Sequence, residues 1–326
     1  MEVLFERGIY LPAAGLWMDS RARRGSAFIS HAHKDHVGPH AQPISTPATA
    51  RLVGQPLKKG AIQLEYGEPM STPQGTITLY PAGHCLGSAQ LLFTSKATGE
   101  RVVYTGDFKV KPNPTAAPLQ TVPCDTLIME STFGAPRFQL PSEEQVLSKL
   151  ETSLKQAQEA GKVPVVLAYR VGKSQEVLWH LLKQGFSAAL APEIYEATMA
   201  YQELGVPFPK GGSLRPYDGR PRDGEVLLFP PGSAREELHE LKRRRLIFLT
   251  GWAIETWARS RFRVDEALPL SDHADFAELV AFVKAVSPRR VYTVFGFPHL
   301  AEHLRSLGYK ATHLSRGNLP AQLKLF

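Results

Sequence analysis

The chain has 326 residues, of which 43% are hydrophobic and 21% are charged, and its formal net charge is +7. It is long enough to bury a large core and long for one domain, and its modest positive charge permits an anionic partner without proving one. The two cysteines, Cys85 and Cys124, form no Cys-x-x-Cys pair and argue against a disulfide framework. The sequence shows no charged-then-apolar leader and no apolar run near the roughly 18 residues of a membrane span, so we expect a cytoplasmic protein with no membrane partner.

The first informative segment follows a short apolar strand predicted at residues 27–29. It reads Ser30-His31-Ala32-His33-Lys34-Asp35-His36 and holds four potential metal ligands. Alternation at a strand end places His31 and His33 on one face, while Asp35 and His36 turn toward a neighbouring metal position. Imidazole and carboxylate are ligands that zinc and manganese accept. A solvated polar loop is the alternative, but later segments supply the ligands that complete a metal site.

Two further predicted strands end in potential ligands. Residues 76–80 lead to Gly83-His84, and residues 101–105 lead to Gly106-Asp107. Glycine beside each ligand suits a backbone that turns tightly or approaches a metal closely. Three strand ends therefore supply an ordered set of imidazoles and carboxylates. Cys85 follows His84, and we interpret it as a small buried filler rather than as a ligand.

The middle of the chain reads as an inserted unit of helices and strands. Ser142 and Gln145 have capping-box spacing and predict the start of a helix that ends near Gly161. Its apolar face recurs at steps of three and four residues and consists of Val146, Leu147, Leu150, Leu154 and Ala157. A strand is predicted at residues 163–169 and a second helix from residue 172 onward. This alternation predicts a parallel α/β layer, with loops and short strands in the Gly- and Pro-rich residues 207–231.

Basic residues gather in three short clusters. They are the Lys-Arg-Arg-Arg run at residues 242–245, the alternating Arg259, Arg261 and Arg263, and the group Arg21, Arg23 and Arg24 just before the first ligand segment. Alternation places the side chains of an extended segment on one face. Each cluster alone fits a solvated loop or an edge strand protected by charge. Three clusters around a metal-site framework favour a track for a polyanion.

The ordered ligand set resembles the signature of the metallo-β-lactamase superfamily, His-x-His-x-Asp-His followed by a His and a bridging Asp. The resemblance covers essentially the whole chain. The residues that it assigns to one metal, zinc or manganese, are His31, His33, His84 and Asp107. It also implies that Asp35, His36 and the bridging Asp107 offer part of a second site. Asp19 matches the early aspartate that supports the metal loop of the family.

Three more segments resemble the β-CASP nucleases within that superfamily. They are residues 127–134 with Glu130, residues 169–176 with Gly172-Lys173, and residues 270–276 with Ser271-Asp272-His273. The resemblance implies an α/β fold in which residues 1–134 and 264–326 form a four-layer αββα metallo-β-lactamase sandwich. Residues 135–263 would then form an inserted β-CASP domain, which ordinary lactamases and glyoxalases of the superfamily lack.

Phosphodiester hydrolysis needs activated water, neutralised phosphate oxygens and a proton for the leaving alkoxide. We expect His273 to hydrogen-bond a phosphate oxygen or to act as the acid, and Glu130 to orient it and favour its imidazolium form. The alternatives are a solvated strand end for Glu130 and a polar helix start for His273. Backbone amides near Gly172, together with Lys173, are a further candidate site for a phosphate.

Residues 291–297, Val-Tyr-Thr-Val-Phe-Gly-Phe, depart from the RNA-processing relatives, which carry a His in a Val-His-Gly context. Phe295 stands at the position of that His and cannot bind a metal, and the Artemis-like DNA-processing branch also lacks it. We therefore expect one tightly bound metal, a second site that is weak or empty, and DNA rather than RNA as substrate. An offset alignment would instead recruit His299 or His303, which read more naturally as part of a surface helix.

The compact length, the Gly251-Trp252 element and the Ser-Asp-His-Ala-Asp motif resemble bacterial DNA exonucleases associated with an ATP-dependent DNA ligase and a helicase. The resemblance implies a metal-dependent exonuclease of DNA repair. Its substrate would be single-stranded DNA or DNA with a free end, attacked mostly from a 5′ end. The candidates for phosphate and nucleic-acid binding are Ser131, Thr132, Lys173 and Arg261, the first three for a pocket around a terminal phosphate.

Three other functions stay open. An RNA-processing β-CASP ribonuclease shares every motif except the missing His. A small-molecule hydrolase such as a lactonase fits the ligand set but not the inserted unit or the arginine clusters. A non-catalytic nucleic-acid-binding scaffold would be expected to lose ligands, whereas the ligands of the first three strand ends are all present.

Overall fold

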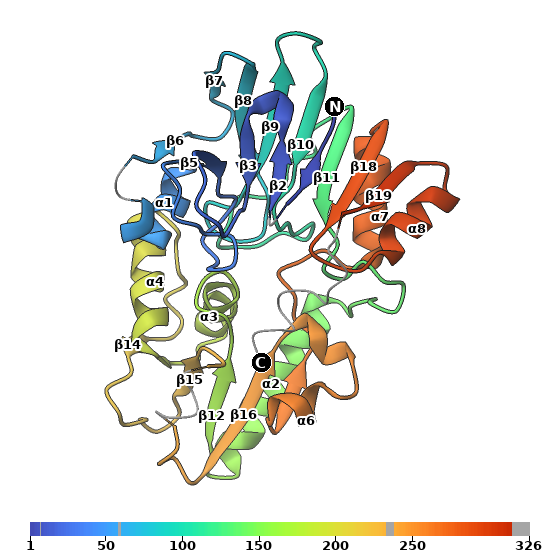
Figure 1. Cartoon of the computed structure of the whole chain (residues 1–326). Helices are drawn as coiled ribbons and strands as arrows, with labels where there is room; N and C mark the ends of the chain where they lie inside the picture. Colours follow the sequence, from blue (N-terminus) through green and yellow to red (C-terminus); the bar gives the residue numbers. More distant parts are fainter. Residues whose placement is uncertain (7, 58–59, 233–237, 315–326) are drawn as a thin grey trace. The chain divides into compact units, whose positions relative to one another are not determined.

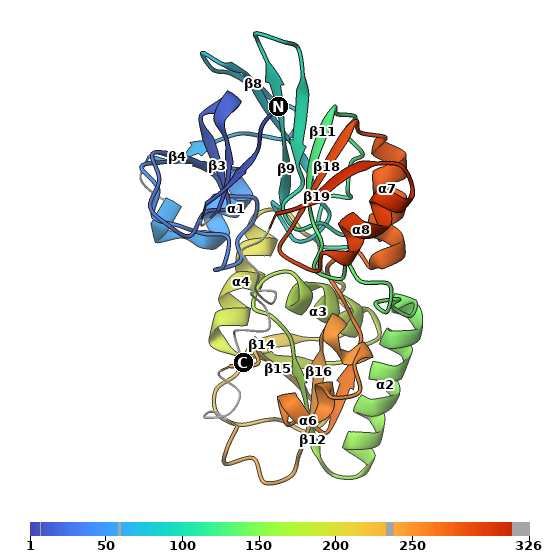
Figure 2. The same ribbon diagram turned by 45° about the vertical axis from the view of Figure 1, so that its right-hand side comes forward.

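Short apolar strands and tight turns build the part of the chain that carries the His and Asp motifs. The computed structural model describes residues 1–6, 8–57, 60–232 and 238–314, and its ribbon is drawn from two sides (Figures 1 and 2). The chain divides into two compact units: unit 1 comprises Met1–Gln139 and His273–Phe326, and unit 2 comprises Leu140–Asp272. Helices and sheets occur in both units, so the expectation of an α/β protein is confirmed.

The first sheet of unit 1 is formed by strands of the N-terminal segment. In spatial order these are β1 (Leu4–Phe5), β2 (Ile9–Leu11), β3 (Leu16–Met18), β4 (Ser26–Phe28), β5 (Gln42–Ser45) and β6 (Ile62–Gln63). Pairs from β1 to β3 are antiparallel, and pairs from β3 to β6 are parallel. Strand β4 leads directly into the ligand-bearing residues 30–36.

The second sheet of unit 1 combines early strands with strands from the C-terminal segment. In spatial order these are β19 (Lys310–His313), β18 (Arg290–Val294), β11 (Thr126–Glu130), β10 (Arg101–Tyr104), β9 (Ala89–Ser95), β8 (Gly75–Pro81) and β7 (Pro69–Ser71). The pairing directions make β8, β10, β11 and β18 parallel to one another. Their carboxyl ends therefore share one edge of the sheet, from which the segments with His84, Asp107 and Glu130 emerge.

Unit 1 has two apolar cores, one on each face of the second sheet. The core between the two sheets includes Ile9 and Phe28 from the first sheet and Leu91 and Tyr104 from the second. On the opposite face, α7 (Phe276–Val286) and α8 (His299–Ser306) bury their apolar stripes against β9, β10, β11, β18 and β19 (Figure 2). Burial on both faces explains why β9, β10 and β11 are rich in apolar residues without alternation.

A smaller apolar cluster lies on the first sheet's side of unit 1. It joins Ile29, which follows β4, to Ala50 of α1 (Pro47–Val53) and to Leu57 of the short 3-10 helix η2 (Gln55–Leu57). Another 3-10 helix, η1 (Pro12–Ala14), connects β2 to β3. The start of the segment after β4 therefore packs against α1 and η2.

The chain leaves unit 1 and returns to it at neighbouring points. The Phe276 N–H donates to the Phe138 carbonyl oxygen at 3.1 Å. The buried Phe138 ring also lies 5.3 Å from the rings of Phe133 and Phe297. Residues 135–139 therefore belong to unit 1, although the sequence-based boundary placed them in the insertion.

Unit 2 is built on a sheet in which every described pair of strands is parallel. In spatial order the strands are β14 (Leu214–Pro216), β13 (Ala188–Leu190), β15 (Val226–Phe229), β12 (Val163–Leu167), β16 (Arg244–Leu249) and β17 (Glu266–Leu268). Because β17 pairs with β16, unit 2 extends to Asp272 and not to residue 263. The predicted parallel α/β layer and the short strands within residues 207–231 are confirmed.

Helices cover one face of this sheet with the predicted apolar stripes. Helix α2 (Glu143–Glu159) starts at Ser142, whose side chain accepts the Gln145 N–H, and α3 (Lys173–Lys183) starts where expected. Both pack against β12, β13, β15 and β16, together with Ile194 of α4 (Pro192–Glu203). Across the described residues, every helix is too short or too polar to cross a membrane.

One sequence-based interpretation is wrong. Arg259 and Arg261 lie in the short helix α6 (Ala258–Phe262), which follows the 3-10 helix η3 (Gly251–Ile254), and Arg263 is its left-handed C-cap. Residues two apart on a helix do not face each other, so these arginines form no single face as they would on an extended segment. The aromatic neighbours Trp257 and Phe262 carry the packing that favours the helix.

Leu150 of α2 is fully buried in the core of unit 2, whereas Leu204 at the C-cap of α4 is 37% exposed. We expect Leu150→Ala to lower the free energy of unfolding by about 2–5 kcal/mol, because it removes apolar contacts and leaves a cavity. Leu204→Ala should change it by less than about 0.5 kcal/mol. Chemical denaturation of both variants measures the difference, and equal effects would contradict the assignment of α2 to the core.

Candidate metal centre

A buried carboxylate organises the residues around the β4 end. Asp19 follows β3 in a left-handed conformation with φ 44°. Its Oδ1 accepts the Ser30 N–H at 2.7 Å, and its Oδ2 accepts the Ser30 hydroxyl at 2.6 Å and the Tyr104 hydroxyl at 2.7 Å. His36 Nδ1 also lies 2.8 Å from Oδ2. Asp19 therefore fixes both ends of the ligand-bearing loop.

These contacts determine which ring nitrogens face the centre. The Ser30 hydroxyl donates to Asp19, so it accepts from His31 Nδ1, which lies 2.9 Å away. His36 Nδ1 donates to the Asp19 carboxylate in the same way, because an ionised carboxylate is only an acceptor. Both rings then present Nε2 to the interior of the site. Such contacts behind the ligands are what orients histidines in metal sites.

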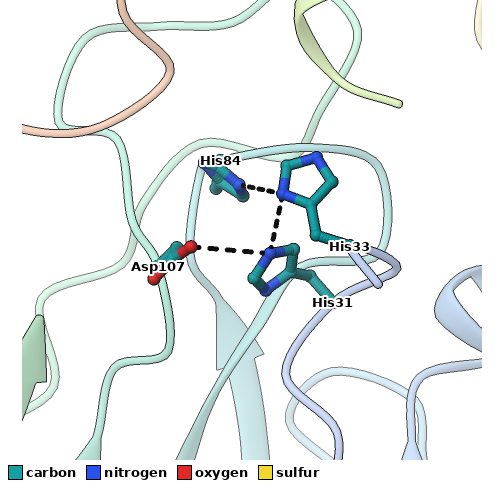
Figure 3. Close-up of side chains that lie close together, drawn as sticks. All are labelled: His31, His33, His84 and Asp107. Atoms are coloured by element: carbon teal, nitrogen blue, oxygen red, sulfur yellow. Dashed lines mark hydrogen bonds and ion pairs between the residues drawn. The ribbon is translucent and has the colours of Figure 1, made fainter. Parts of the chain in front are cut away.

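Four side chains converge on one point, as Figure 3 shows: His31, His33, His84 and Asp107. His33 Nδ1 lies 2.9 Å from His31 Nε2 and 3.1 Å from His84 Nε2. Asp107 Oδ2 lies 3.6 Å from His31 Nε2. Ligand atoms about 2.0–2.2 Å from a tetrahedral ion are separated by about 3.3–3.6 Å. The 3.6 Å separation lies in this range and the two separations between histidines are slightly shorter, so the donor set fits a single divalent ion after small outward movements of the rings.

The protonation of this group suits metal binding. Burial, with repulsion from the neighbouring imidazoles, holds the pKa of His31 well below its ordinary value. A neutral imidazole keeps a lone pair for a cation. Burial alone would raise the pKa of Asp107, but His36 and His273 outweigh it and hold that pKa well below the ordinary value. Asp107 is therefore ionised and available as an anionic ligand.

Asp107 also connects this group to His36. His36 Nε2 lies 3.2 Å from Asp107 Oδ2 and 3.7 Å from Asp35 Oδ2. Burial would lower the pKa of His36, but the carboxylates of Asp107 and Asp19 outweigh it and raise that pKa well above its ordinary value. Among Asp35, His36 and Asp107, Asp35 is the most exposed, with 25% of its side chain accessible. Asp35 and Asp107 thus both lie beside His36.

Phe295 occupies the space beside His36. It follows β18 with φ 60°, and its ring centroid lies 5.7 Å from that of His36 in an edge-to-face arrangement. The two histidines of α8 lie elsewhere: His303 packs at a tilted angle on Phe276, and His299 packs at a tilted angle on Phe297. Within the described chain, neither of these two histidines belongs to a group of converging metal-ligand atoms.

Glu130 and His273 form a buried pair next to the ligand group. Glu130 Oε1 lies 2.8 Å from His273 Nδ1 and accepts the Phe108 N–H at 3.0 Å. Its Oε2 accepts the Thr132 N–H at 3.3 Å. The His273 ring centroid is 4.8 Å from that of His84. Two segments that are far apart in the sequence thus meet beside the converging ligands.

The residues expected to bind phosphate are divided between the two units. The Ser131 N–H and hydroxyl both donate to the Val294 carbonyl, and Ser131 and Thr132 are buried in unit 1. Lys173 lies in unit 2, where its Nζ is 2.9 Å from Asp272 Oδ1 and only 3% of its side chain is exposed. Arg261 is exposed on α6 of the same unit.

Two supporting residues were not anticipated from the sequence. Tyr104 binds Asp19 across the two sheets, and the Asn113 side chain donates to the His84 carbonyl oxygen at 3.3 Å. Tyr104 ends β10 three residues before Asp107, and this position is the only local signal that Tyr104 lies near the site. The sequence gives no comparable signal for Asn113.

No protein-family model matches the chain. The chain is 36% identical over 322 residues to a probable DNA ligase of Opitutus terrae, a match that covers 97% of this chain and 31% of that protein. It is 28% identical over 317 residues to 5' exonuclease Apollo of Gallus gallus, covering 88% of this chain and 63% of Apollo. Transcription termination factor FttA of Pyrococcus abyssi is 33% identical over 152 residues, covering 45% of this chain and 23% of that protein. The chain therefore spans less than two thirds of the length of each of these relatives.

The contacts of Asp19 predict a large stability effect. We expect Asp19→Ala to lower the free energy of unfolding of the metal-free protein by about 3 kcal/mol or more, because buried donors on Ser30, Tyr104 and His36 lose their acceptor. Asp19→Asn should cost less, since Asn keeps one acceptor oxygen and tolerates a left-handed backbone. Urea denaturation in the presence of a chelator tests this order, and an Asn variant as unstable as the Ala variant would refute it.

Proposed function

The chain belongs to the β-CASP branch of the metallo-β-lactamase superfamily, and we propose that it is a metal-dependent DNA exonuclease that acts in DNA repair, from a 5′ end. The observation that carries the proposal is the convergence of three imidazoles and one carboxylate beside the buried Glu130–His273 pair. The relatives named as a probable DNA ligase and as a 5' exonuclease support DNA as the substrate.

We assign the two units to the two parts of this family's fold. Unit 1 is proposed to be the metallo-β-lactamase domain, a four-layer αββα sandwich, and unit 2 the inserted β-CASP domain. The shared core between the two sheets of unit 1 and the helices α7 and α8 on its second sheet support the sandwich. The parallel sheet of unit 2, inserted between two segments of unit 1, supports the second assignment.

The metal ligands in this proposal are His31, His33, His84 and Asp107, and the ion is zinc or manganese. When bound, it supplies a Lewis acid that activates water and neutralises phosphate charge. Asp35, His36 and Asp107 offer part of a second site, but Phe295 lies where a further ligand would stand. We therefore propose one tightly bound metal and a second site that is weak or empty.

The remaining side chains divide the proton transfers of hydrolysis. Asp35, at the accessible edge of the centre, is placed to take the proton of the attacking water. His273, held through Nδ1 by Glu130, is placed to hydrogen-bond a phosphate oxygen or to protonate the leaving alkoxide. Asp19 acts indirectly, because it holds Ser30 and His36. The buried contacts of Ser131 and Lys173 argue against giving them a terminal phosphate, whereas Arg261 stays a candidate contact for DNA.

A DNA ligase is the partner that fits best. The relative from Opitutus terrae matches nearly all of this chain but less than a third of its own length, so a chain of this kind occurs there within a protein named as a ligase. None of the three relatives described above is named as a helicase. The second candidate function is an RNA-processing β-CASP ribonuclease, which the partial match to FttA favours only weakly.

The test of the function uses matched single-stranded DNA and RNA, each labelled at one end, with zinc or manganese. We expect stepwise digestion of DNA from the 5′ end and little cleavage of RNA. Asp35→Ala and His273→Ala should each reduce the rate by at least about 10²-fold, the usual contribution of a proton-transfer residue. His299→Ala, which removes an exposed imidazole of α8, is the matched control and should retain the wild-type rate.

Internal cuts in RNA at rates that match or exceed those on DNA would replace this proposal by the ribonuclease. Binding of nucleic acid without cleavage, at every metal tried, would favour the scaffold. Full activity of Asp35→Ala or His273→Ala would remove that residue from the proposed chemistry.

Phe295 gives a separate prediction about metal content. His tolerates a left-handed backbone such as that of residue 295, and its ring would face His36 in place of the phenyl ring. We expect Phe295→His to raise the tightly bound metal from about one to about two ions per chain, because it adds an imidazole ligand. Phe295→Leu should stay at about one. Metal analysis by mass spectrometry after dialysis measures this, and an unchanged content in the His variant would show that residue 295 does not limit the second site.

A further inference from the structure

The structure separates the arginines of the basic clusters by whether the fold already uses them. Arg243 and Arg244 donate to the Ala160 and Leu241 carbonyl oxygens, and Arg245 pairs with Glu266 at 2.9 Å. Arg24 donates to the Ser20 hydroxyl and the Glu6 carbonyl oxygen, and its guanidinium lies 3.4 Å from the Trp17 ring centroid. These side chains stabilise the protein itself.

Arg21 and Arg23 differ from this group. Both are exposed, and neither makes a hydrogen bond, an ion pair or a ring contact with any residue whose position is described. Arg259, Arg261 and Arg263 are exposed as well, but they belong to unit 2, whereas every proposed metal ligand belongs to unit 1. Arg21 and Arg23 are therefore the uncommitted basic cluster on the unit that contains the metal centre.

The loop that carries them is held at both ends. On one side, the buried Ser20 accepts from Arg24 Nε at 3.1 Å, and its carbonyl oxygen lies so near Gly38 that a Cβ there would approach it to 2.3 Å. On the other side, the Arg24 carbonyl oxygen accepts the Ala41 N–H at 2.9 Å. Because both ends are fixed, the backbone that carries the two arginines has little conformational entropy left to lose on binding.

The loop also lies next to the metal centre. Asp19, which contacts His36 and Ser30, is two residues before Arg21, so the two Cα atoms are at most about 7.6 Å apart. The planar guanidinium group is a donor suited to phosphate oxygens, and two such groups without carboxylate partners attract a phosphodiester chain. We propose that Arg21 and Arg23 bind the phosphate backbone of a single DNA strand where it approaches the metal centre. This inference rests on the proposed function and adds the residues that grip the substrate.

The experiment compares two double variants that remove the same charge from unit 1. Arg21→Ala/Arg23→Ala removes the proposed contacts, and Arg289→Ala/Arg290→Ala removes two exposed arginines at the start of β18, about 16 Å along that strand from Phe295. With the metal-loaded full chain, we expect the first variant to raise KM for DNA about tenfold while kcat stays within about twofold. A plot of log(kcat/KM) against log salt should become shallower by about 1.4, or about 0.7 for each lost phosphate contact on a single strand. The control variant should match wild type.

A conservative variant and a binding measurement complete the design. Arg21→Lys/Arg23→Lys keeps both charges and should retain most of the salt slope, which separates lost contacts from a disturbed loop. Fluorescence anisotropy measures binding independently of cleavage. Comparing the same oligonucleotide with polyglutamate tests whether the two arginines bind DNA or another polyanion. Equal effects of the two Ala variants, an unchanged KM and slope in Arg21→Ala/Arg23→Ala, or tighter binding of polyglutamate than of DNA would overturn the inference. If wild type binds DNA through these arginines but cleaves none, the proposed function fails and this inference stands.

Discussion

The buried Asp19 carboxylate is the interaction on which the centre depends. A carboxylate without water must have its lone pairs satisfied, and here Ser30, Tyr104 and His36 satisfy them. These donors come from the β4 end, from β10 of the second sheet and from the ligand loop. One carboxylate therefore sets the register between two sheets and the orientation of two histidines.

The ligands converge because strands that run in one direction end at one edge. His84, Asp107 and Glu130 leave the second sheet at the carboxyl ends of β8, β10 and β11, while His31 and His33 arrive from the first sheet. This arrangement brings several imidazoles together, and burial with repulsion from its neighbours holds the pKa of His31 well below the ordinary value. The ionised Asp107, between His31 and His36, is the counter-charge that makes the cluster tolerable and selective for a cation.

Local motifs were readable from the sequence: the ligand segments converge, and helices start at Ser142 and Lys173. The association of Glu130 with His273, which lies 143 residues later, was expected from the family resemblance and not from a local motif. Other features set by distant partners had no such signal. The motif around Lys173 gives no sign of its buried pairing with Asp272, and the alternating arginines lie in a helix, where Trp257 packs against Phe262. Tyr104 had no signal as a partner of Asp19, since only the packing of two sheets brings them together.

The backbone hydrogen bond between Phe276 and Phe138 bears on how a chain of this fold can gain or lose length. The points where the polypeptide departs from unit 1 and rejoins it are adjacent, which is the geometry at which whole domains are inserted without disturbing the host. A bridge of few residues would suffice to close unit 1 on itself. Unit 2 can therefore change in length and in surface without altering the strand order of unit 1, which assembles the ligands.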